Sequence, residues 1–486
     1  MAAVSRRMPK ASRVTMKVWL FGEGLVLNGS AHPRRSDFGR GRAVVTDSNL
    51  AMNAALGTIS IHPAMMLPFG LLLAAIAMAP LLGKWWGRHY AKVAGALSLV
   101  VVAWYVLGLD DWARISGTAH DYVSFIVLIG ALYVVSGGIH ITVKGRATPG
   151  RNLIFLFVGA LIANVLGTTG ASILLIHPWL RMNQNRFAGY QVAFFIFIVS
   201  NVGGCLTPIS DPPLLIGYLL GVPFWWVARH GFLIWATGLG ILLMMFYALD
   251  SYHFRRAAKA PLIEAAGAES WHFDGLKNLF FLAVVLGAVF LNHPPFLREG
   301  IMLAAAVASY YSTPKSVHES NEFNLRPIKE VAILFLGIFA TMMPALDWLE
   351  GHAAALNSPS LGFFYAGSGG LSSILDSAPT YYCFAHTLFG RFVPADALGA
   401  GVVATDQARM AFLLGDHKLS AFILAVSVGS VFFGAATYLG NGPNLIIKAV
   451  VEHRKFRAPG FLEYIFKYAL PWLGPMLVVV WLLFFR

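Results

Sequence analysis

The hydrophobic positions of this chain fall into long, nearly continuous runs. Runs of roughly the length of a membrane helix lie near residues 64–82, 91–109, 121–143, 231–249, 276–292, 296–311, 329–346 and 463–485. A helix needs about 20 mostly apolar residues to cross a bilayer, whereas the strands of an outer-membrane barrel would alternate apolar and polar positions. The pattern therefore predicts an all-α polytopic membrane protein.

Composition supports this prediction and narrows the function classes. Of the 486 residues, 57% are hydrophobic and only 12% are charged, against about 25% charged in soluble domains. The net charge of +13 fits basic cytoplasmic loops better than nucleic-acid binding. The two cysteines form no CxxC pattern, and no Walker, dinucleotide or nucleophile-elbow motif occurs. We therefore predict that the protein is not an enzyme and has no cofactor. Any transport would be driven by a gradient of Na⁺, H⁺ or both.

Residues 188–220 predict a membrane helix that unwinds in its middle. Apolar stretches flank Gly203-Gly204 and the prolines at 208, 212 and 213. Glycine lets the backbone leave a helix, and proline lacks the N–H that would continue one. Opened backbone at membrane depth is tolerated where it lines a cavity, so Asp211 in this segment is a candidate functional residue. The alternative is a surface loop between two short spans, in which Asp211 caps a turn.

Residues 152–181 are too short and too interrupted for two full spans. A small, polar segment at 164–170 separates two apolar stretches, and Arg151 and Arg181 make both ends basic. Because basic residues favour the cytoplasmic side, both ends are predicted to lie there, joined by a re-entrant hairpin. The alternative is one full span with a polar patch, which would place the two arginines on opposite sides.

The second half of the chain repeats this order of elements, with a hairpin near 360–390 and a broken helix near 419–450. A shift of 230 positions places Ser200–Ile216 on Ser430–Ile446, with six identities in 17 positions. Five crossings in each half would leave the second copy upside down relative to the first, as in many secondary transporters.

This repeat defines the predicted domains. They are an N-terminal extension (1–60), a first inverted repeat (61–249), a cytoplasmic linker (250–275) and a second inverted repeat (276–486). The extension is interpreted as a disordered or targeting segment, or as sequence that precedes a true start near Met52. An amphipathic helix at 396–415 has no counterpart in the first half.

Four polar tips would then meet near the middle of the bilayer. Their hydroxyl, amide, carboxylate and main-chain oxygens are the ligands that a hard cation such as Na⁺ prefers, and half-helix N-termini suit an anion. Competition of Na⁺ and H⁺ for Asp376, or for Asp211, would give antiport; alternatively, both carboxylates only cap half-helices. The candidate ion- or substrate-binding residues are Asn164, Thr168, Thr169, Gly170, Asn201, Gly203, Thr207, Asp211, Ser373, Asp376, Ser377, Thr380, Thr437, Asn441 and Asn444, with Asp376, Asp211, Asn164 and Asn441 as the predicted Na⁺ ligands.

In three segments, at 203–213, 371–381 and 440–445, the sequence resembles the ion transporter superfamily, and most closely its citrate transporter-like branch. Members of that branch are often described as sodium:proton antiporters. The resemblance covers roughly residues 60–486. It implies a scaffold domain and a mobile transport domain that holds the hairpins and broken helices, in a homodimer of the inner cell membrane that works by an elevator motion.

The tips of this chain depart from those of dicarboxylate-carrying relatives, which have a Ser-Asn-Thr motif. The first tip reads Gly167-Thr168-Thr169-Gly170, and the second contains Asp376-Ser377. A carboxylate at a tip would repel a di- or tricarboxylate, and no lysine or arginine of the tips compensates. We therefore expect Na⁺:H⁺ antiport, with coupled citrate or dicarboxylate transport as the alternative and a channel or non-transporting scaffold as a third. The expected partners are the lipid bilayer and a small ion or carboxylate, with no nucleic acid.

Overall fold

The computed structural model describes residues 62–143, 147–256, 271–291, 294, 296–321, 323–352, 360–375, 377–394 and 405–486. The extension predicted at 1–60 and the candidate residue Asp376 lie outside this part of the chain. Within it, seven helices are long and apolar enough to cross a membrane, so the predicted multi-pass helical architecture is confirmed.

The first half begins with the turn η1 (Pro63–Met66) and the helices α2 (Leu67–Ala77), α3 (Ala79–Leu107) and α4 (Trp112–Gly137). The gap between the apolar runs at 64–82 and 91–109 would be a loop, but its residues belong to α3, which bends at Gly83, where φ is +50°. Long basic side chains can stay on a helix at a membrane surface by extending toward water. The connection between the apolar runs at 91–109 and 121–143 is also short, since α4 begins at Trp112 and Asp111 caps it by accepting a 2.9 Å hydrogen bond from the Arg114 amide.

A two-stranded antiparallel sheet departs from the predicted all-α fold. It pairs β1 (His140–Val143) with β2 (Trp271–Asp274), with His140 opposite Asp274. The span predicted at 121–143 therefore ends early, at Gly137. The sheet ties the end of α4 to the start of the second half. The predicted linker is also partly helical, because α8 (Trp226–Arg256) continues to Arg256; residues 257–270 lie outside the described part.

Helix α5 (Pro149–Asn183) is a hairpin, as predicted. The side-chain amide of Asn152 donates to Asn183 Oδ1 over 2.8 Å, whereas positions 31 residues apart in a straight helix would be separated by about 46 Å. The reversal occurs at Gly167, whose φ of 77° and ψ of 155° are essentially restricted to glycine. The alternative of one span with Arg151 and Arg181 on opposite sides is therefore wrong.

The first broken helix follows this hairpin and has the predicted interruption. It consists of α6 (Gly189–Ile198), the 3₁₀ turn η2 (Val202–Gly204) and α7 (Pro212–Leu219). Helix α6 is apolar on all sides, and its residues 190–198 are all buried. A helix of this composition must be enclosed by other helices or by lipid, and the burial of its residues shows that other helices enclose α6.

The second half has the same order of elements. It contains α9 (Asn278–Ala288), α10 (Leu297–Ser312), α11 (Lys315–Ser320), α12 (Arg326–His352), the hairpin arms α13 (Leu361–Ile374) and α14 (Ser377–Phe392), α16 (Asp406–Gly415), the broken helix α17 (His417–Phe433), η4 (Gly434–Ala436) and α18 (Gly442–His453), and a last span formed by α19 (Phe461–Glu463), the π-helix η5 (Tyr464–Leu473) and α20 (Gly474–Phe484). The predicted amphipathic helix corresponds to α16, which begins later, at Asp406; residues 395–404 lie outside the described part.

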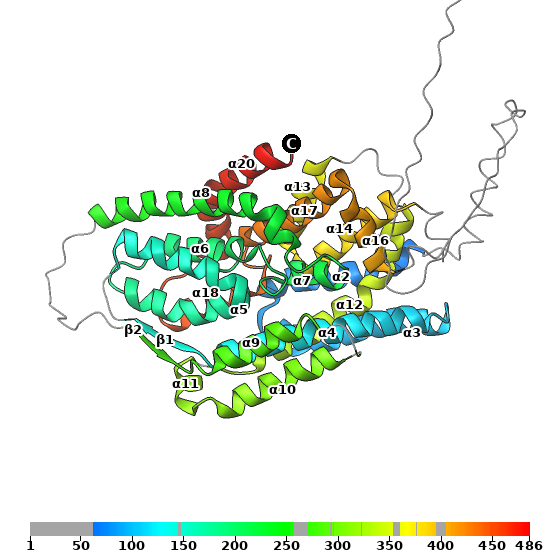
Figure 1. Cartoon of the computed structure of the whole chain (residues 1–486), viewed down its shortest axis with the longest axis horizontal. Helices are drawn as coiled ribbons and strands as arrows, with labels where there is room; N and C mark the ends of the chain where they lie inside the picture. The colour runs from blue at the N-terminus through cyan, green and yellow to red at the C-terminus, as the bar shows by residue number, and fades with distance from the viewer. Residues whose placement is uncertain are drawn as a thin grey trace, which may run out of the picture. The chain divides into compact units, whose positions relative to one another are not determined.

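The helices of residues 62–486 pack as two groups. Helices α3, α4, α9, α10 and α12 contact one another and form the α4 group, whereas the α5 group contains both hairpins, both broken helices and the last span of each half. Figure 1 shows α3, α4, α9 and α10 together, with α5, α6, α8 and α18 beside them. The α4 group contacts the α5 group through α4 with α5 and through α12 with α14.

Candidate functional site

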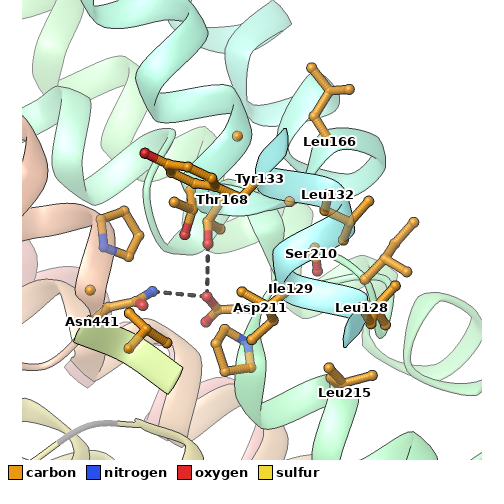
Figure 2. A pocket seen from close by; sticks show the side chains of 18 of the residues that line it. Leu128, Ile129, Leu132, Tyr133, Leu166, Thr168, Ser210, Asp211, Leu215 and Asn441 are labelled. Carbon is orange, nitrogen blue, oxygen red and sulfur yellow. Dashed lines mark hydrogen bonds between the residues drawn. The ribbon is translucent and has the colours of Figure 1, made fainter. Parts of the chain in front are cut away.

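A pocket lies where the tip of hairpin α5, the unwound stretch before α7 and the first residues of α18 meet the α4 group. Its cavity volume is about 90 Å³. A single water needs only about 10–15 Å³ measured in this way, so the pocket can hold a small ion with some of its water shell. Asp211, only 2% exposed, is among the residues that line it. Figure 2 shows the Asp211 carboxylate between Thr168 and Asn441.

The Asp211 carboxylate accepts hydrogen bonds from both halves of the chain. Thr168 Oγ1 donates to Asp211 Oδ1 over 2.9 Å, and Asn441 Nδ2 donates to the same oxygen over 2.8 Å. The tip is also fixed through its main chain, because the Thr168 amide donates to the Ser210 carbonyl over 2.7 Å. The arrangement therefore presents one buried carboxylate, a hydroxyl and an amide to the cavity.

An asparagine network joins the two broken helices behind this carboxylate. Asn441 Nδ2 lies 3.1 Å from Asn201 Oδ1 and 3.2 Å from the Ser200 carbonyl. Asn201 Nδ2 in turn donates to Asn444 Oδ1 over 2.8 Å. Segments more than 200 residues apart in sequence thus meet through their polar residues, as the sequence predicts for these tips.

The two halves hold their tips with the same kind of bond. Thr207 Oγ1 donates to the Asn164 carbonyl over 2.6 Å, and Thr437 Oγ1 donates to the Ser373 carbonyl over 2.6 Å. In each case a threonine of the unwound stretch fixes a hairpin carbonyl. Asn164 contributes further, because Nδ2 donates to the Gly203 carbonyl over 2.6 Å and Oδ1 accepts from the Leu206 amide over 3.0 Å.

The predicted site residues therefore separate into two sets. Thr168, Thr169, Gly170, Asp211 and Asn441 line the pocket. The other predicted residues that the structure describes do not line it. Those that hold the unwound segments through their side chains or carbonyls are Asn164, Asn201, Gly203, Thr207, Ser373, Thr437 and Asn444. Ser377 and Thr380 lie buried on α14, outside the pocket lining.

The rest of the pocket lining is mostly apolar and comes from both groups, with α4 and α12 forming the wall on the side of the α4 group. Leu128, Leu132 and Phe335 are among the side chains that face the polar tip. None of the described residues that line the pocket is a lysine, arginine or histidine. Among the described residues, no group of three or more histidine, cysteine, aspartate or glutamate side chains could hold a metal ion, so a bound cation would depend on hydroxyl, amide and main-chain oxygens as well as on Asp211.

Sequence reasoning missed two sets of residues that support the site. An ion pair of Arg186 with Asp250 joins the base of hairpin α5 to α6 and α8. Trp235 and Tyr464 donate hydrogen bonds to the carbonyls of Gly203 and Ala435 in the unwound turns. The isolated acid Asp250 at the end of an apolar span was a signal for the ion pair, whereas the main-chain partners left no signal in the sequence.

The described residues form seven helices long and apolar enough to cross a membrane, together with paired broken helices around a buried carboxylate, and this combination is typical of a multi-pass membrane transporter. Residues 58–485 match the model of the family described as "Putative citrate transport", and the chain belongs to this family. This match confirms the resemblance to the citrate transporter-like branch. No curated protein compared with the chain matches it.

Proposed function

We propose that this transporter exchanges Na⁺ for H⁺ across the inner cell membrane, with Asp211 as an ion-binding carboxylate. The observation that carries the proposal is the buried Asp211 carboxylate, held by a hydroxyl and an amide at a mostly apolar pocket without a lysine, arginine or histidine among the described lining residues. One carboxylate can bind either a proton or a monovalent cation. Mutually exclusive binding of the two gives exchange when the site alternates between the two sides of the membrane with one or the other bound.

The same pocket argues against a tricarboxylate. Three negative charges placed beside Asp211 would need compensating cations, and burial makes like-charge repulsion more costly than in water. Coupled transport of citrate or a dicarboxylate is nevertheless the second candidate, because the description of the family names citrate. Asp376 keeps the role predicted from the sequence, and it would add a further negative charge.

Matching elements in the two halves support an inverted repeat with an elevator motion. Each half contributes a hairpin, a broken helix and a threonine bond from the unwound stretch to the hairpin. The α5 group, which carries the polar tips, would move against the α4 group, whose wall at the pocket is apolar. Apolar side chains make few directional bonds and so resist sliding less than a polar wall would. A homodimer built on the α4 group belongs to the same proposal.

The test is ion flux in proteoliposomes with an internal pH dye. Addition of Na⁺ or Li⁺ should dissipate an imposed proton gradient, and labelled citrate or succinate should not accumulate. Asp211→Asn should abolish exchange without loss of folded protein, since the amide oxygen can still accept from Thr168. Glu330→Gln, at an exposed ion pair with Arg326, is the matched control and should exchange normally.

Each alternative has its own outcome in this assay. Gradient-dependent uptake of citrate without cation-driven proton movement would replace antiport by carboxylate transport. Flux without saturation and without counterflow would indicate a channel. Normal exchange by Asp211→Asn would show that this carboxylate is structural, and Asp376→Asn in the same assay tests the second predicted carboxylate.

A further inference from the structure

The unwound turns of the two broken helices are each held by one aromatic donor from the last span of the same half. In the first half, Trp235 Nε1 of α8 donates to the Gly203 carbonyl of η2 over 2.9 Å. In the second half, Tyr464 Oη of η5 donates to the Ala435 carbonyl of η4 over 2.7 Å. The donor follows its acceptor by 32 residues in one half and by 29 in the other.

Both donors are buried, at 5% exposed for Trp235 and 0% for Tyr464. A carbonyl released from a helix inside a membrane protein has no water to accept from, so a side-chain donor must replace the lost helical bond. An indole N–H and a phenol O–H supply that donor while the rest of the ring packs as an apolar group. The two residues differ in type but meet the same requirement at the same place.

We infer that Trp235 and Tyr464 are positioning residues for the binding site, each of which fixes the shape of one unwound turn. The Gly203 carbonyl accepts from both Trp235 Nε1 and Asn164 Nδ2, so both of its lone pairs are occupied. It is therefore a structural acceptor in this state, although the sequence suggested it as an ion ligand. Asn164 lies three residues before Gly167, so its bond to Gly203 also restrains the hairpin tip.

The second turn is connected to the site through a longer series of hydrogen bonds. The Gly434 carbonyl, next to Ala435, accepts from Asn444 Nδ2 over 2.9 Å. Asn444 Oδ1 accepts from Asn201, whose own Oδ1 lies near Asn441. Trp235 thus shares its acceptor with one asparagine, Asn164, whereas Tyr464 is connected to Asn441 through the turn and two further asparagines. Neither donor is among the described residues that line the pocket.

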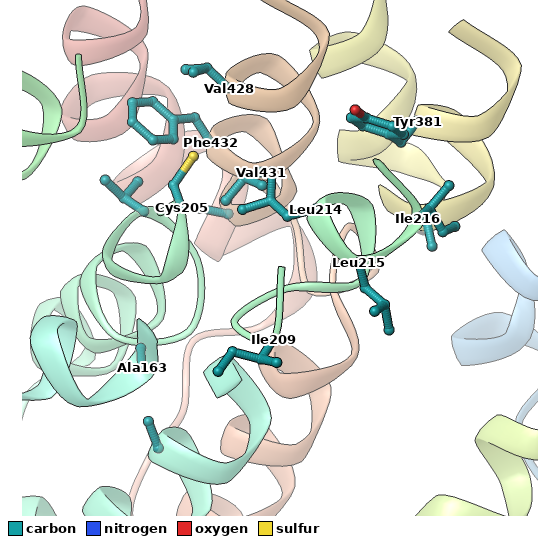
Figure 3. Close-up of a cluster of buried hydrophobic side chains, with 14 of the residues drawn as sticks. Ala163, Cys205, Ile209, Leu214, Leu215, Ile216, Tyr381, Val428, Val431 and Phe432 are labelled. Atoms are coloured by element: carbon teal, nitrogen blue, oxygen red, sulfur yellow. The ribbon is translucent and has the colours of Figure 1, made fainter. Parts of the chain in front are cut away.

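The inference deepens the proposed function, because it names the residues that keep the site in a binding-competent shape. Its main test does not depend on which ion or substrate is carried. Cys205 directly follows η2 and is 1% exposed, so its reaction with a thiol reagent reports opening of the first turn. Figure 3 shows Cys205 among Val428, Val431 and Phe432 of α17.

The first experiment measures alkylation of Cys205 by N-ethylmaleimide in a Cys383→Ser background. Trp235→Phe removes the N–H and keeps an aromatic ring, and it should accelerate labelling about fivefold, as expected for loss of one hydrogen bond. Tyr464→Phe is the internal control and should leave the Cys205 rate within about twofold, since its bond lies in the other half. Unchanged labelling in Trp235→Phe, or equal acceleration by both variants, would overturn the inference.

The reciprocal experiment places the reporter in the second turn, as Ala436→Cys in a background without native cysteines. Here Tyr464→Phe should accelerate labelling and Trp235→Phe should not.

If Trp235→Phe gives too little folded protein for the Cys205 experiment, the tryptophan analogue with sulfur in place of the indole N–H removes the bond at nearly constant shape. Labelling of Cys205 at the wild-type rate with that analogue would also overturn the inference.

The apparent KM for transport distinguishes a positioning role from a purely structural one. For whichever solute the wild type carries, both Phe variants should raise the apparent KM several-fold, with maximal rates within about twofold at equal amounts of folded protein, because the turns set binding geometry. Tyr468→Phe, on the same helix as Tyr464, is the control and should keep its KM. Failure of the wild type to exchange Na⁺ for H⁺ would refute the proposed function, while the labelling result would still decide this inference.

Discussion

Neutralising Asp250 should destabilise the whole α5 group, because this carboxylate ties the base of hairpin α5 to two other helices. Asp250 lies on α8 and is 0% exposed. Arg186 holds it with two bonds, Nη1 to Oδ1 at 2.6 Å and Nη2 to Oδ2 at 2.9 Å. Tyr190 Oη and Asn152 Nδ2 also donate to it, over 2.7 and 3.1 Å.

The magnitude follows from what each substitution leaves behind. Removing one partner of a buried ion pair costs about 3–5 kcal/mol, because the other charge remains without compensation. The Arg186 side chain is 15% exposed, so in Asp250→Asn it regains some hydration, and we expect the low end, about 3 kcal/mol. Arg186→Met leaves a fully buried carboxylate that still accepts from Tyr190 and Asn152, and we expect about 3–4 kcal/mol.

The double variant separates the ion pair from general damage to the cluster. With both charges removed, no buried charge is left unpaired, so the cost should be about 2 kcal/mol less than the sum of the single variants. The assay is equilibrium unfolding in mixed detergent micelles, followed by tryptophan fluorescence. Glu330→Gln, whose partner Arg326 is 80% exposed, is the control, and it should change the free energy of unfolding by less than about 0.5 kcal/mol. A loss below about 1 kcal/mol for Asp250→Asn, or additive effects in the double variant, would refute the reasoning.

Three further outcomes are expected. Gly167→Ala should cost about 1–3 kcal/mol in the same unfolding assay, because alanine disfavours a φ of 77°, whereas Gly150→Ala, in a helix with open space, should not. Thr168→Val removes one donor to Asp211, so it should raise the KM for the carried ion but leave measurable exchange, unlike Asp211→Asn; an unchanged KM would contradict this. Hydrogen bonds from the Leu419 and Lys418 amides lower the pKa of Asp416, outside the spans, so Asp416→Ala should lower the melting temperature. Since the folded-state pKa is depressed, this loss should be full above the ordinary aspartate pKa and vanish as pH falls through the folded value; a pH-independent loss would contradict it.

The hairpins and broken helices were predictable because apolar runs can be interrupted in few ways inside a membrane. Small and polar residues at 164–170, between two short apolar stretches with basic ends, left a hairpin as the interpretation consistent with the charge pattern. Gly203, Gly204 and the neighbouring prolines likewise marked the unwound stretch. In both cases the residue types themselves limit what the backbone can do, so local sequence was sufficient.

Elements that depend on distant or main-chain partners were not predictable. Four-residue strands such as β1 and β2 are too short to show a period, and their pairing joins segments about 130 residues apart. The basic residues between the apolar runs at 64–82 and 91–109 suggested a loop, although they belong to α3. Trp235 appeared as one more apolar residue of a span, because its acceptor is a backbone carbonyl that every residue type carries.

The sequence predicted a ligand set by residue type, and only the geometry distinguishes residues that face the cavity from residues that hold its walls. An asparagine in an unwound segment has donors and an acceptor that can serve either purpose. The side-chain amides of Asn164 and Asn201 bond to main-chain and side-chain partners inside the protein, whereas Asn441 donates to Asp211 at the edge of the cavity. Substitutions at the first two should therefore act on the cavity through its shape. In the proposed exchange, the chemistry would fall to the smaller set around Asp211, whose buried carboxylate would bind either a proton or a metal ion.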